Sequence, residues 1–313
     1  MRLLALVIVG VLVSAGCGPD DQTVGGPDST TTLFTMTRDE VSAASEPAIQ
    51  NAETVSKALD AHDGDLLRTA FGPSSYVVDP IVPSLRPGIA TWFSIFRSFC
   101  TGVLLHDIYV NVDGSVFNGD CSGFYDGHVD DPPAALPVLS ELWLEDGLAR
   151  RLMNRLDAAT LEAYPTETSD VIGFPSSQEA AVSAAAQTAV RFASTWVETW
   201  QSGELEPIAA LYAPDGVRVD GFAALADDSA ALMVWLESFT DSYDEVAVEI
   251  ELLTASALGP AAVYRLELVD GAGSCEMQIA SVWDLDEKDR ILRESVYYHP
   301  ESTFACGWEQ TDR

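Results

Sequence analysis

Two aspartates stand at the ends of closely similar stretches of the sequence. Asp220 ends the stretch YAPDGVRVD, in which a turn signal leads into a short β-branched run, and Asp79 ends the comparable run that begins at Phe71. A carboxylate in a water-poor pocket has a raised pKa and can exchange protons near neutral pH. An aspartate at the end of a strand also commonly caps the turn that follows. Both interpretations stay open for Asp220.

The histidines do not have the spacing of metal ligands. No two of them stand four residues apart, and none is close to a cysteine in the way that zinc ligands are. The sequence also lacks a phosphate-binding glycine loop, a nucleophile elbow and a zincin motif. We therefore expect no metal and no cofactor. His299 is a candidate for a weak acid or base at the end of the last predicted strand. The histidines are His62, His106, His128 and His299.

Four cysteines besides Cys17 suit two disulfides in an exported chain. They are Cys100, Cys121, Cys275 and Cys306. Four cysteines allow three connectivities, and we prefer Cys100 with Cys121 and Cys275 with Cys306, because each pair then lies within one domain.

An internal repeat sets the framework for these residues. At an offset of about 140 residues, Trp143 matches Trp283 and Asp146 matches Asp286. Two related domains explain this self-similarity. We place them at residues 46–164 and 176–313, with a linker at 165–175.

The second domain reads as helices followed by strands. Apolar residues recur at three- and four-residue spacing from Val182 to Trp200, which predicts a helix ended by Gly203. A short helix, the strand ending at Asp220 and a third helix at about 230–239 follow. Period-two alternation then predicts four strands, at about 246–252, 262–268, 277–283 and 291–299. This order predicts an α+β fold with one face of an antiparallel sheet covered.

The first domain begins in the same way and ends differently. A predicted helix follows Ser45-Glu-Pro47 and ends at Gly64. Leucines and alanines at 148–163 have helical spacing, so this domain is expected to have a helix where the second has its last strand.

The N-terminus has the layout of a lipoprotein signal. Arg2 precedes an apolar run at 3–13, and small residues stand directly before Cys17. The run is too short to span a bilayer. Residues 1–17 therefore predict a signal peptide with a lipobox and lipidation at Cys17, and an ordinary signal peptide is the alternative. The polar stretch at 18–45 predicts a flexible tether. Together they predict export and lipid anchoring at the outer face of a membrane of the bacterial envelope.

The charge of the chain argues against one class of partner. The sequence has 49 acidic and 16 basic residues, a formal net charge of -33. A field of this sign repels nucleic acid and anionic lipid headgroups, so we expect no nucleic-acid partner.

Several motifs of the second domain, taken with the order of its elements, point to a known superfamily. They are Trp196–Leu205, Leu211–Gly216, Val219–Asp220 and Leu285–Tyr298. These features resemble the NTF2-like superfamily, in particular SnoaL-like polyketide cyclases and ketosteroid isomerases. The resemblance implies two tandem cone-shaped domains, each with N-terminal helices packed on a curved, mainly antiparallel sheet. This fold hosts many functions, so it predicts architecture better than activity.

The resemblance also implies a site at the mouth of an apolar cone. Asp220 matches the general base of ketosteroid isomerases, and Asp79 is its counterpart in the first domain. Trp196 and Ser281 match the positions of the oxyanion donors. The resemblance further implies a ligand pocket lined by Trp196, Tyr212, Trp235, Gln278, Ser281 and Tyr297.

Three hypotheses for function follow. The leading one is an exported, lipid-anchored protein that binds a small apolar ligand in the second cone, with its domains pairing within the chain or through a homodimer. The second is a cyclase or isomerase with Asp220 as general base. The third is a protein-interaction module whose cones are filled by side chains.

Overall fold

The computed structural model describes residues 38–78, 88–97, 100, 102–122, 136–159, 176–222, 226, 228–256, 259–271 and 273–301. The predicted signal peptide, most of the predicted tether and the predicted linker lie outside these residues. Cys17, Asp79, His128 and Cys306 lie outside them as well. They include the predicted lipidation site, Cys17, and the first-domain counterpart of Asp220, Asp79.

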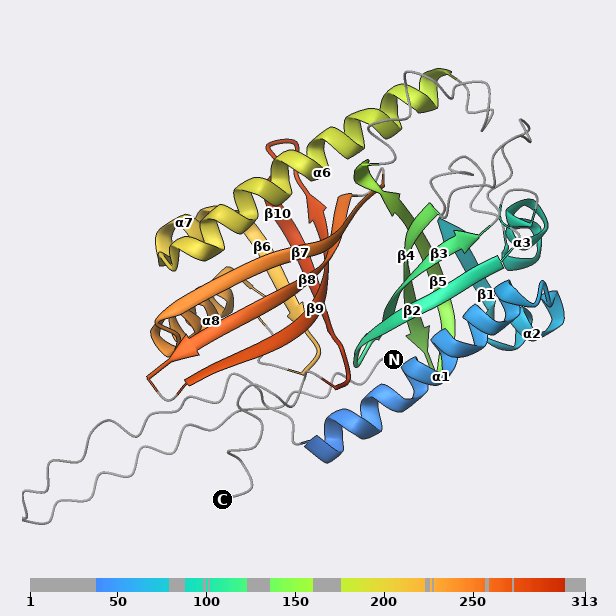
Figure 1. Ribbon diagram of the computed structural model, residues 1–313, viewed down its shortest axis with the longest axis horizontal. Coiled ribbons are helices and arrows are strands. Elements are labelled where there is room, and N and C mark those ends of the chain that lie inside the picture. The colour runs from blue at the N-terminus through green and yellow to red at the C-terminus, as the bar shows by residue number, and fades with distance from the viewer. Residues whose placement is uncertain are drawn as a thin grey trace, which may run out of the picture. The chain divides into compact units, whose positions relative to one another are not determined.

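The same order of elements occurs twice along the chain (Figure 1). The first half comprises α1 (Arg38–Asp60), α2 (Gly64–Thr69), β1 (Phe71–Val78), α3 (Ile89–Phe96), β2 (Gly102–Asn111), β3 (Gly114–Ser122), β4 (Leu136–Glu145) and β5 (Leu148–Asp157). The second half comprises α6 (Ser176–Ser202), α7 (Leu205–Ala210), β6 (Tyr212–Asp220), α8 (Ser229–Ser242), β7 (Glu245–Ser256), β8 (Gly259–Asp270), β9 (Gly273–Leu285) and β10 (Ile291–Tyr298). The α+β class predicted from the sequence is confirmed.

The strands of the two halves pair by the same rules. β2 to β5 and β7 to β10 are antiparallel neighbours in sequence order, while β1 pairs in parallel with β5 and β6 in parallel with β10. Two pairings join the halves. Val110 of β2 is opposite Tyr298 of β10, and Leu156 of β5 is opposite Ala255 of β7. In the order of elements, β7 is the counterpart of β2, and β10 is the counterpart of β5. The two pairings between the halves are therefore equivalent, and an approximate two-fold axis relates the halves.

Each long helix contributes to the hydrophobic cores of both halves. Val41 and Ala48 of α1 belong to the second-half core, whereas the following turns of α1 belong to the first-half core. Ala186 and Ala189 of α6 likewise belong to the first-half core, and the later turns of α6 to the second-half core. The two helices therefore connect the halves in a reciprocal way.

A third hydrophobic cluster lies between the strands of the two halves, and we call it the interface core. Tyr109 and Val116 from the first half share this cluster with Val263, Val282 and Tyr297 from the second. Their neighbours along each strand face the helices, because successive side chains of a strand point to opposite faces. The strands form one ten-stranded sheet, and in each half helices cover one face of it while the strands of the other half cover the opposite face.

The structure corrects the predicted end of the first half. Residues 148–157 form the strand β5, where helical spacing had predicted a helix. This strand is buried on both faces, because Leu152 faces the first-half core while Arg155 faces the other half. A strand that is buried on both faces lacks the alternation of polar and apolar residues that identifies strands. The spacing of its leucines can then resemble that of an amphipathic helix.

The limits of α1 also differ from the prediction. The helix begins at Arg38, inside the predicted tether, and it contains Pro47. It ends at Asp60, while Gly64 begins α2. Val41 is 2% exposed, so burial against the second-half core stabilises this first part of the helix.

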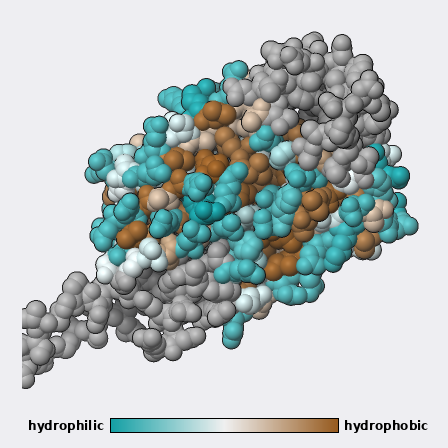
Figure 2. Space-filling model, in the orientation of Figure 1, coloured by the Kyte–Doolittle hydropathy of each residue, from teal (hydrophilic) through white to brown (hydrophobic). Residues whose placement is uncertain are grey.

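The predicted disulfide between Cys100 and Cys121 is present, with a Cα–Cα distance of 5.6 Å. Cys275 is disulfide-bonded as well, and its predicted partner lies outside the described residues. None of the helices in the described part of the chain is long and apolar enough to cross a membrane. Figure 2 shows hydrophilic and hydrophobic side chains interspersed on the face in view.

Candidate functional site

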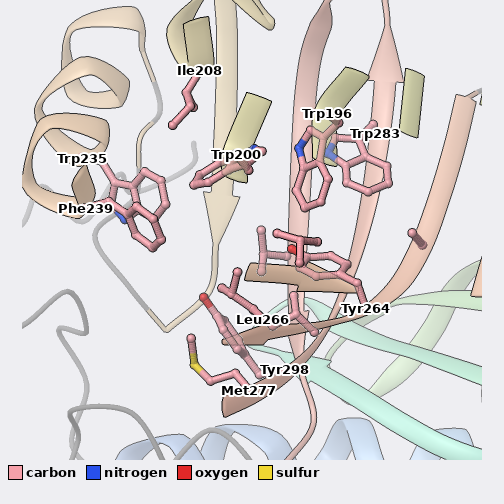
Figure 3. Packing of buried hydrophobic residues seen from close by; sticks show 14 of the residues in the cluster. Trp196, Trp200, Ile208, Trp235, Phe239, Tyr264, Leu266, Met277, Trp283 and Tyr298 are labelled. Atoms are coloured by element: carbon pink, nitrogen blue, oxygen red, sulfur yellow. The ribbon is translucent and has the colours of Figure 1, made fainter. Parts of the chain in front are cut away.

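Aromatic side chains fill the space between α6, α8 and the second-half sheet (Figure 3). Trp196 and Trp200 stand one turn apart on α6, and Trp235 and Phe239 do so on α8, so each pair projects from one face of its helix. The ring centroids of Trp196 and Trp200 are 5.8 Å apart, and those of Trp200 and Phe239 are 5.2 Å apart. From the sheet, Tyr264 meets the ring of Trp196 edge-on at 5.0 Å.

A small cavity remains among these rings. Its volume is about 20 Å³, which holds about one water molecule. Its lining residues are Trp196, Trp200, Arg218, Trp235, Phe239, Tyr264 and Leu266. The cone that the sequence predicts is therefore nearly filled by its own side chains.

Several polar atoms around this cavity are hydrogen-bond donors without an acceptor. The indole nitrogens of Trp196, Trp200 and Trp235 are buried and have no hydrogen-bond partner among the described residues, and neither has Nε of Arg218. Indole and guanidinium nitrogens donate and do not accept. Leaving one such donor buried and unsatisfied costs about 1–3 kcal/mol. The residues that line the cavity thus carry four unsatisfied donors, and an acceptor within reach of one of them would relieve that cost.

A buried carboxylate lies next to the cavity. Glu294 of β10 is completely buried and accepts hydrogen bonds from the Tyr212 hydroxyl and from Nη1 of Arg218. Nε1 of Trp283 donates to it at 3.1 Å and the Ser281 hydroxyl at 3.3 Å. Burial, followed by the charge of Glu294, raises the pKa of Tyr212 well above its ordinary value. Tyr212 therefore stays neutral and acts as a donor.

Asp220 is also buried and is held by fixed partners. The parallel pairing of β6 with β10 places it opposite Val296. One of its oxygens accepts from the Tyr298 hydroxyl and lies 3.7 Å from Nη2 of Arg218. The other accepts from the backbone N–H of Phe222 at 3.3 Å. This last bond is the turn-capping arrangement of aspartate. Asp220 is not among the residues that line the cavity.

The predicted pocket residues separate into three groups. Trp196 and Trp235 line the cavity. Tyr212 and Ser281 lie behind it, in the network around Glu294. Gln278 and Tyr297 project from the opposite face of the sheet, so the prediction for these two residues is wrong. Gln278 alternates along β9 with Met277 and Ile279 of the second-half core, and Tyr297 belongs to the interface core.

Sequence reasoning missed Arg218, Glu294 and Tyr298. Tyr298 takes the place predicted for its neighbour Tyr297, since it faces the helices and donates to Asp220. The usable signal was one charge in each of two predicted strands, Arg218 in the strand that ends at Asp220 and Glu294 of opposite sign in the last strand. A charge in a strand core requires a partner, and these two residues are partners.

Tyr297 takes part in a second buried network, which joins the halves. Its hydroxyl donates to Glu141 of β4 at 2.8 Å, and Arg155 donates to the same carboxylate at 3.2 Å. Burial alone would raise the pKa of Glu141, but Arg155 and Arg151 and the bonds from Tyr297 and Trp143 hold it below its ordinary value. This carboxylate therefore stays ionised between the two halves.

The histidines of the described residues stand apart from the cavity. His299 lies against the Tyr109 ring, with a centroid distance of 5.8 Å, and its Nε2 is 3.8 Å from Asp107. Within the described ranges, no group of three or more His, Cys, Asp or Glu side chains is placed to hold a metal ion.

No family model and no curated protein matches the chain. Among solved structures, the chain is similar to a Δ5-3-ketosteroid isomerase from Mycobacterium sp., with 20% identity, a TM-score of 0.32 and coverage of 37% of this chain and 95% of that one. For an epoxide hydrolase from M. tuberculosis, the identity is 17%, the TM-score 0.33 and the coverage 38% and 87%.

An NTF2-like protein from Burkholderia pseudomallei shows 12% identity, a TM-score of 0.32 and coverage of 37% and 94%. These structural neighbours thus include a ketosteroid isomerase and an NTF2-like protein.

Proposed function

We propose that this protein is exported and lipid-anchored, and that its second half binds a small, mainly apolar molecule that carries a hydrogen-bond acceptor. The observation that carries the binding proposal is the set of four buried donors without an acceptor around one aromatic cavity. The rings suit an apolar body, and the donors suit a carbonyl or similar oxygen.

Binding requires the cavity to enlarge. A volume of about 20 Å³ accommodates a single acceptor atom, so the body of the ligand needs further space. Trp235 and Phe239 both belong to α8, and their rings stack at a centroid distance of 5.3 Å. An outward shift of α8 would move both rings together and open the space beside Trp196 and Trp200. The donors would then face the entering molecule.

A matched pair of probes tests this proposal. The fluorescence of the cavity tryptophans is titrated with 2-adamantanone and with adamantane, which differ by one carbonyl oxygen. We expect the ketone to bind about tenfold more tightly, because a hydrogen bond to a buried donor contributes about 0.5–1.5 kcal/mol. Trp196→Phe should reduce this preference and Trp92→Phe, a buried tryptophan of the first half, should not. Equal binding of the two probes would contradict the role of the donors.

The small volume favours a second candidate, an interaction module whose cone stays filled. In that case neither probe changes the fluorescence of the folded protein, and the partner contacts the outer surface. Binding of either probe in the cavity argues against this candidate.

An enzyme that uses Asp220 as general base has less support from the geometry. The two oxygens of Asp220 accept hydrogen bonds from Tyr298 and from the Phe222 backbone, and the cavity is lined by other residues. A proton acceptor has to come within hydrogen-bond distance of its substrate. If turnover of any ketone is found, Asp220→Asn should abolish it without unfolding the protein; unchanged turnover would exclude Asp220 from the reaction.

The sequence before the described residues supports the lipid anchor. Cys17 follows an apolar run and small residues, as a lipidation site does. We expect the full chain, expressed in a bacterium, to partition into detergent and to carry acyl chains at Cys17 by mass spectrometry. A Cys17→Ser variant serves as control, and partition of this variant like the wild type would contradict the proposal.

We also propose that the two halves are tandem NTF2-like domains that pair within one chain. The repeated order of elements, the reciprocal strand pairings and the interface core support this. Sedimentation of the lipid-free protein should show a monomer. A stable dimer would indicate that pairing occurs between chains instead.

A further inference from the structure

A polar groove lies in the first half, and it shares no lining residue with the aromatic cavity. It is formed where the end of α1 and the short helix α2 meet α3, three elements that lie together in Figure 1. Its volume is about 840 Å³, which suits a small organic molecule. Its lining residues are Ala61, His62, Asp63, Gly64, Asp65, Arg68, Ala90, Phe93, Ser94 and Arg97.

His62 in this groove has a backbone conformation that histidine rarely adopts. Its φ is 53°, in the left-handed region, where it terminates α1. The N–H of Asp63 donates to the carbonyl of Ala58 at 2.8 Å and that of His62 to Leu59 at 3.3 Å, as in a Schellman motif. At the corresponding turn after α6, the chain has Gly203, with a φ of 65°. Glycine adopts this conformation without strain, so the histidine is retained at a cost in backbone energy.

Nε2 of the His62 imidazole has no fixed partner in the described part of the chain that would explain this cost. This nitrogen is buried and finds no hydrogen-bond partner among the described residues. A strained residue with an unsatisfied polar atom beside a groove is a feature of binding sites, where a ligand supplies the missing partner.

The other charged groups of the groove separate into engaged and free ones. Asp63 caps α2 through the N–H groups of Asp65 and Leu66, each at 3.0 Å, and Arg68 pairs with Asp65. Arg97 is placed 5.9 Å from the centroid of the Phe93 ring and makes no ion pair with a described residue. Of the two arginines that line the groove, Arg97 is therefore the one without an ion pair to a described residue, in a chain whose formal net charge is -33.

We propose that this groove binds a small anionic molecule, with its carboxylate or phosphate group at Arg97 and His62 and its apolar part against Phe93. Guanidinium groups bind such oxyanions through charge-assisted hydrogen bonds. The Phe93 ring lies close to Gly64 in this groove, since a Cβ atom added at Gly64 would lie 3.1 Å from the ring. This site is independent of the aromatic cavity, and neither proposal requires the other.

The test uses the folded protein with two probes, phenylacetate and phenyl phosphate, and measures binding by calorimetry and by the NMR signals of the His62 ring. We expect one or both to bind, and Arg97→Gln to weaken binding about tenfold. The probe that binds more tightly identifies the oxyanion. Absence of binding at millimolar concentration, or unchanged affinity in Arg97→Gln, would overturn the proposal.

His62→Gly separates binding from stability. This change removes the imidazole and relieves the left-handed strain, so the melting temperature should rise while affinity for the probe falls. Asp146→Gly is the matched control, because Asp146 has a φ of 55° in the β4–β5 turn, outside the groove. It should raise the melting temperature and leave affinity unchanged. If His62→Gly binds the probes as tightly as the wild type, the imidazole has no part in the site.

Discussion

At the residue scale, Arg218 is the cation that faces two buried carboxylates, those of Glu294 and Asp220. Burial alone would lower its pKa, but Glu294, Tyr212 and Asp220 raise it well above the ordinary value. The guanidinium also lies 4.2 Å from the centroid of the Trp235 ring. Arg218 therefore connects the charged network with the wall of the cavity.

Replacing Arg218 with Met should destabilise the protein by about 3–5 kcal/mol, because it leaves two carboxylates buried without their cation. Urea unfolding followed by circular dichroism measures the loss. Arg265→Met is the matched control, since the Arg265 side chain is 40% exposed and has Glu249, Glu251 and Glu276 around it. Exposed ion pairs contribute little, so this control should lose about 1 kcal/mol or less. Similar losses in the two variants would show that the buried network is not strongly coupled.

Two aromatic residues of the site, Trp196 and Trp235, were predicted from the sequence, but the other rings that line the cavity and the pairing of its charged residues were not. Trp196 and Trp235 stand at helical spacing in segments that were recognised as helices. To choose between Tyr297 and Tyr298, one has to know which face of β10 each side chain is on. This part of β10 is buried on both sides, so no polar face indicates the orientation. Arg218 and Glu294 became a pair only through the parallel β6–β10 register, which the sequence does not specify.

At the element scale, the first turns of α1 connect the halves. Residues 38–45 read as a polar tether, since this segment is rich in small and acidic residues. Its helix forms because Val41 and Ala48 reach the second-half core, a contact between segments that are distant in sequence. Local composition carries no information on such a contact, which is why the boundary was predicted several residues too late.

Val41→Asp should lower the free energy of unfolding by about 2–4 kcal/mol, because it buries a charge among apolar side chains. Ser42→Asp is the neighbouring control. Ser42 is exposed, so this variant should differ from the wild type by about 0.5 kcal/mol or less. Thermal unfolding of the two variants provides the measurement. If residues 38–45 were a tether in solution, both changes would be silent.

At the scale of the whole molecule, the repeat and the α+β order were predictable because hydrophobic periodicity is a local property. The interface core was not, since it depends on how the strands of one half pack against those of the other. That packing buries both faces of the strands, and it removed the alternation from β5, the element that was predicted wrongly. Prediction therefore succeeded for helices and for strands with one polar face, and it failed where the halves meet.

Stability should fall as the pH rises above about 10. Burial, followed by neighbouring carboxylates, raises the pKa of Tyr109, Tyr212, Tyr264, Tyr297 and Tyr298. Their ordinary pKa is about 10, so above this pH the unfolded chain releases protons that the folded chain retains. Each such tyrosine then lowers the free energy of unfolding by about 1.4 kcal/mol per pH unit.

Absorbance of the phenolate and far-ultraviolet circular dichroism should be followed together in an alkaline titration. We expect the buried tyrosines to ionise only as the protein unfolds, while below pH 10 their contribution is complete. Ionisation of all tyrosines near pH 10 in a protein that keeps its circular dichroism would contradict this expectation.

The joining of the two halves in one chain has a consequence for how the protein behaves at low abundance. Two separate copies of such a unit would associate only above their dissociation constant, and they would come apart on dilution. Within one chain, each half meets the other at an effective concentration that is set by the connecting segment, of millimolar order for a short flexible one. The interface core and the two reciprocal strand pairings can therefore form in a single molecule, however sparsely the protein is distributed.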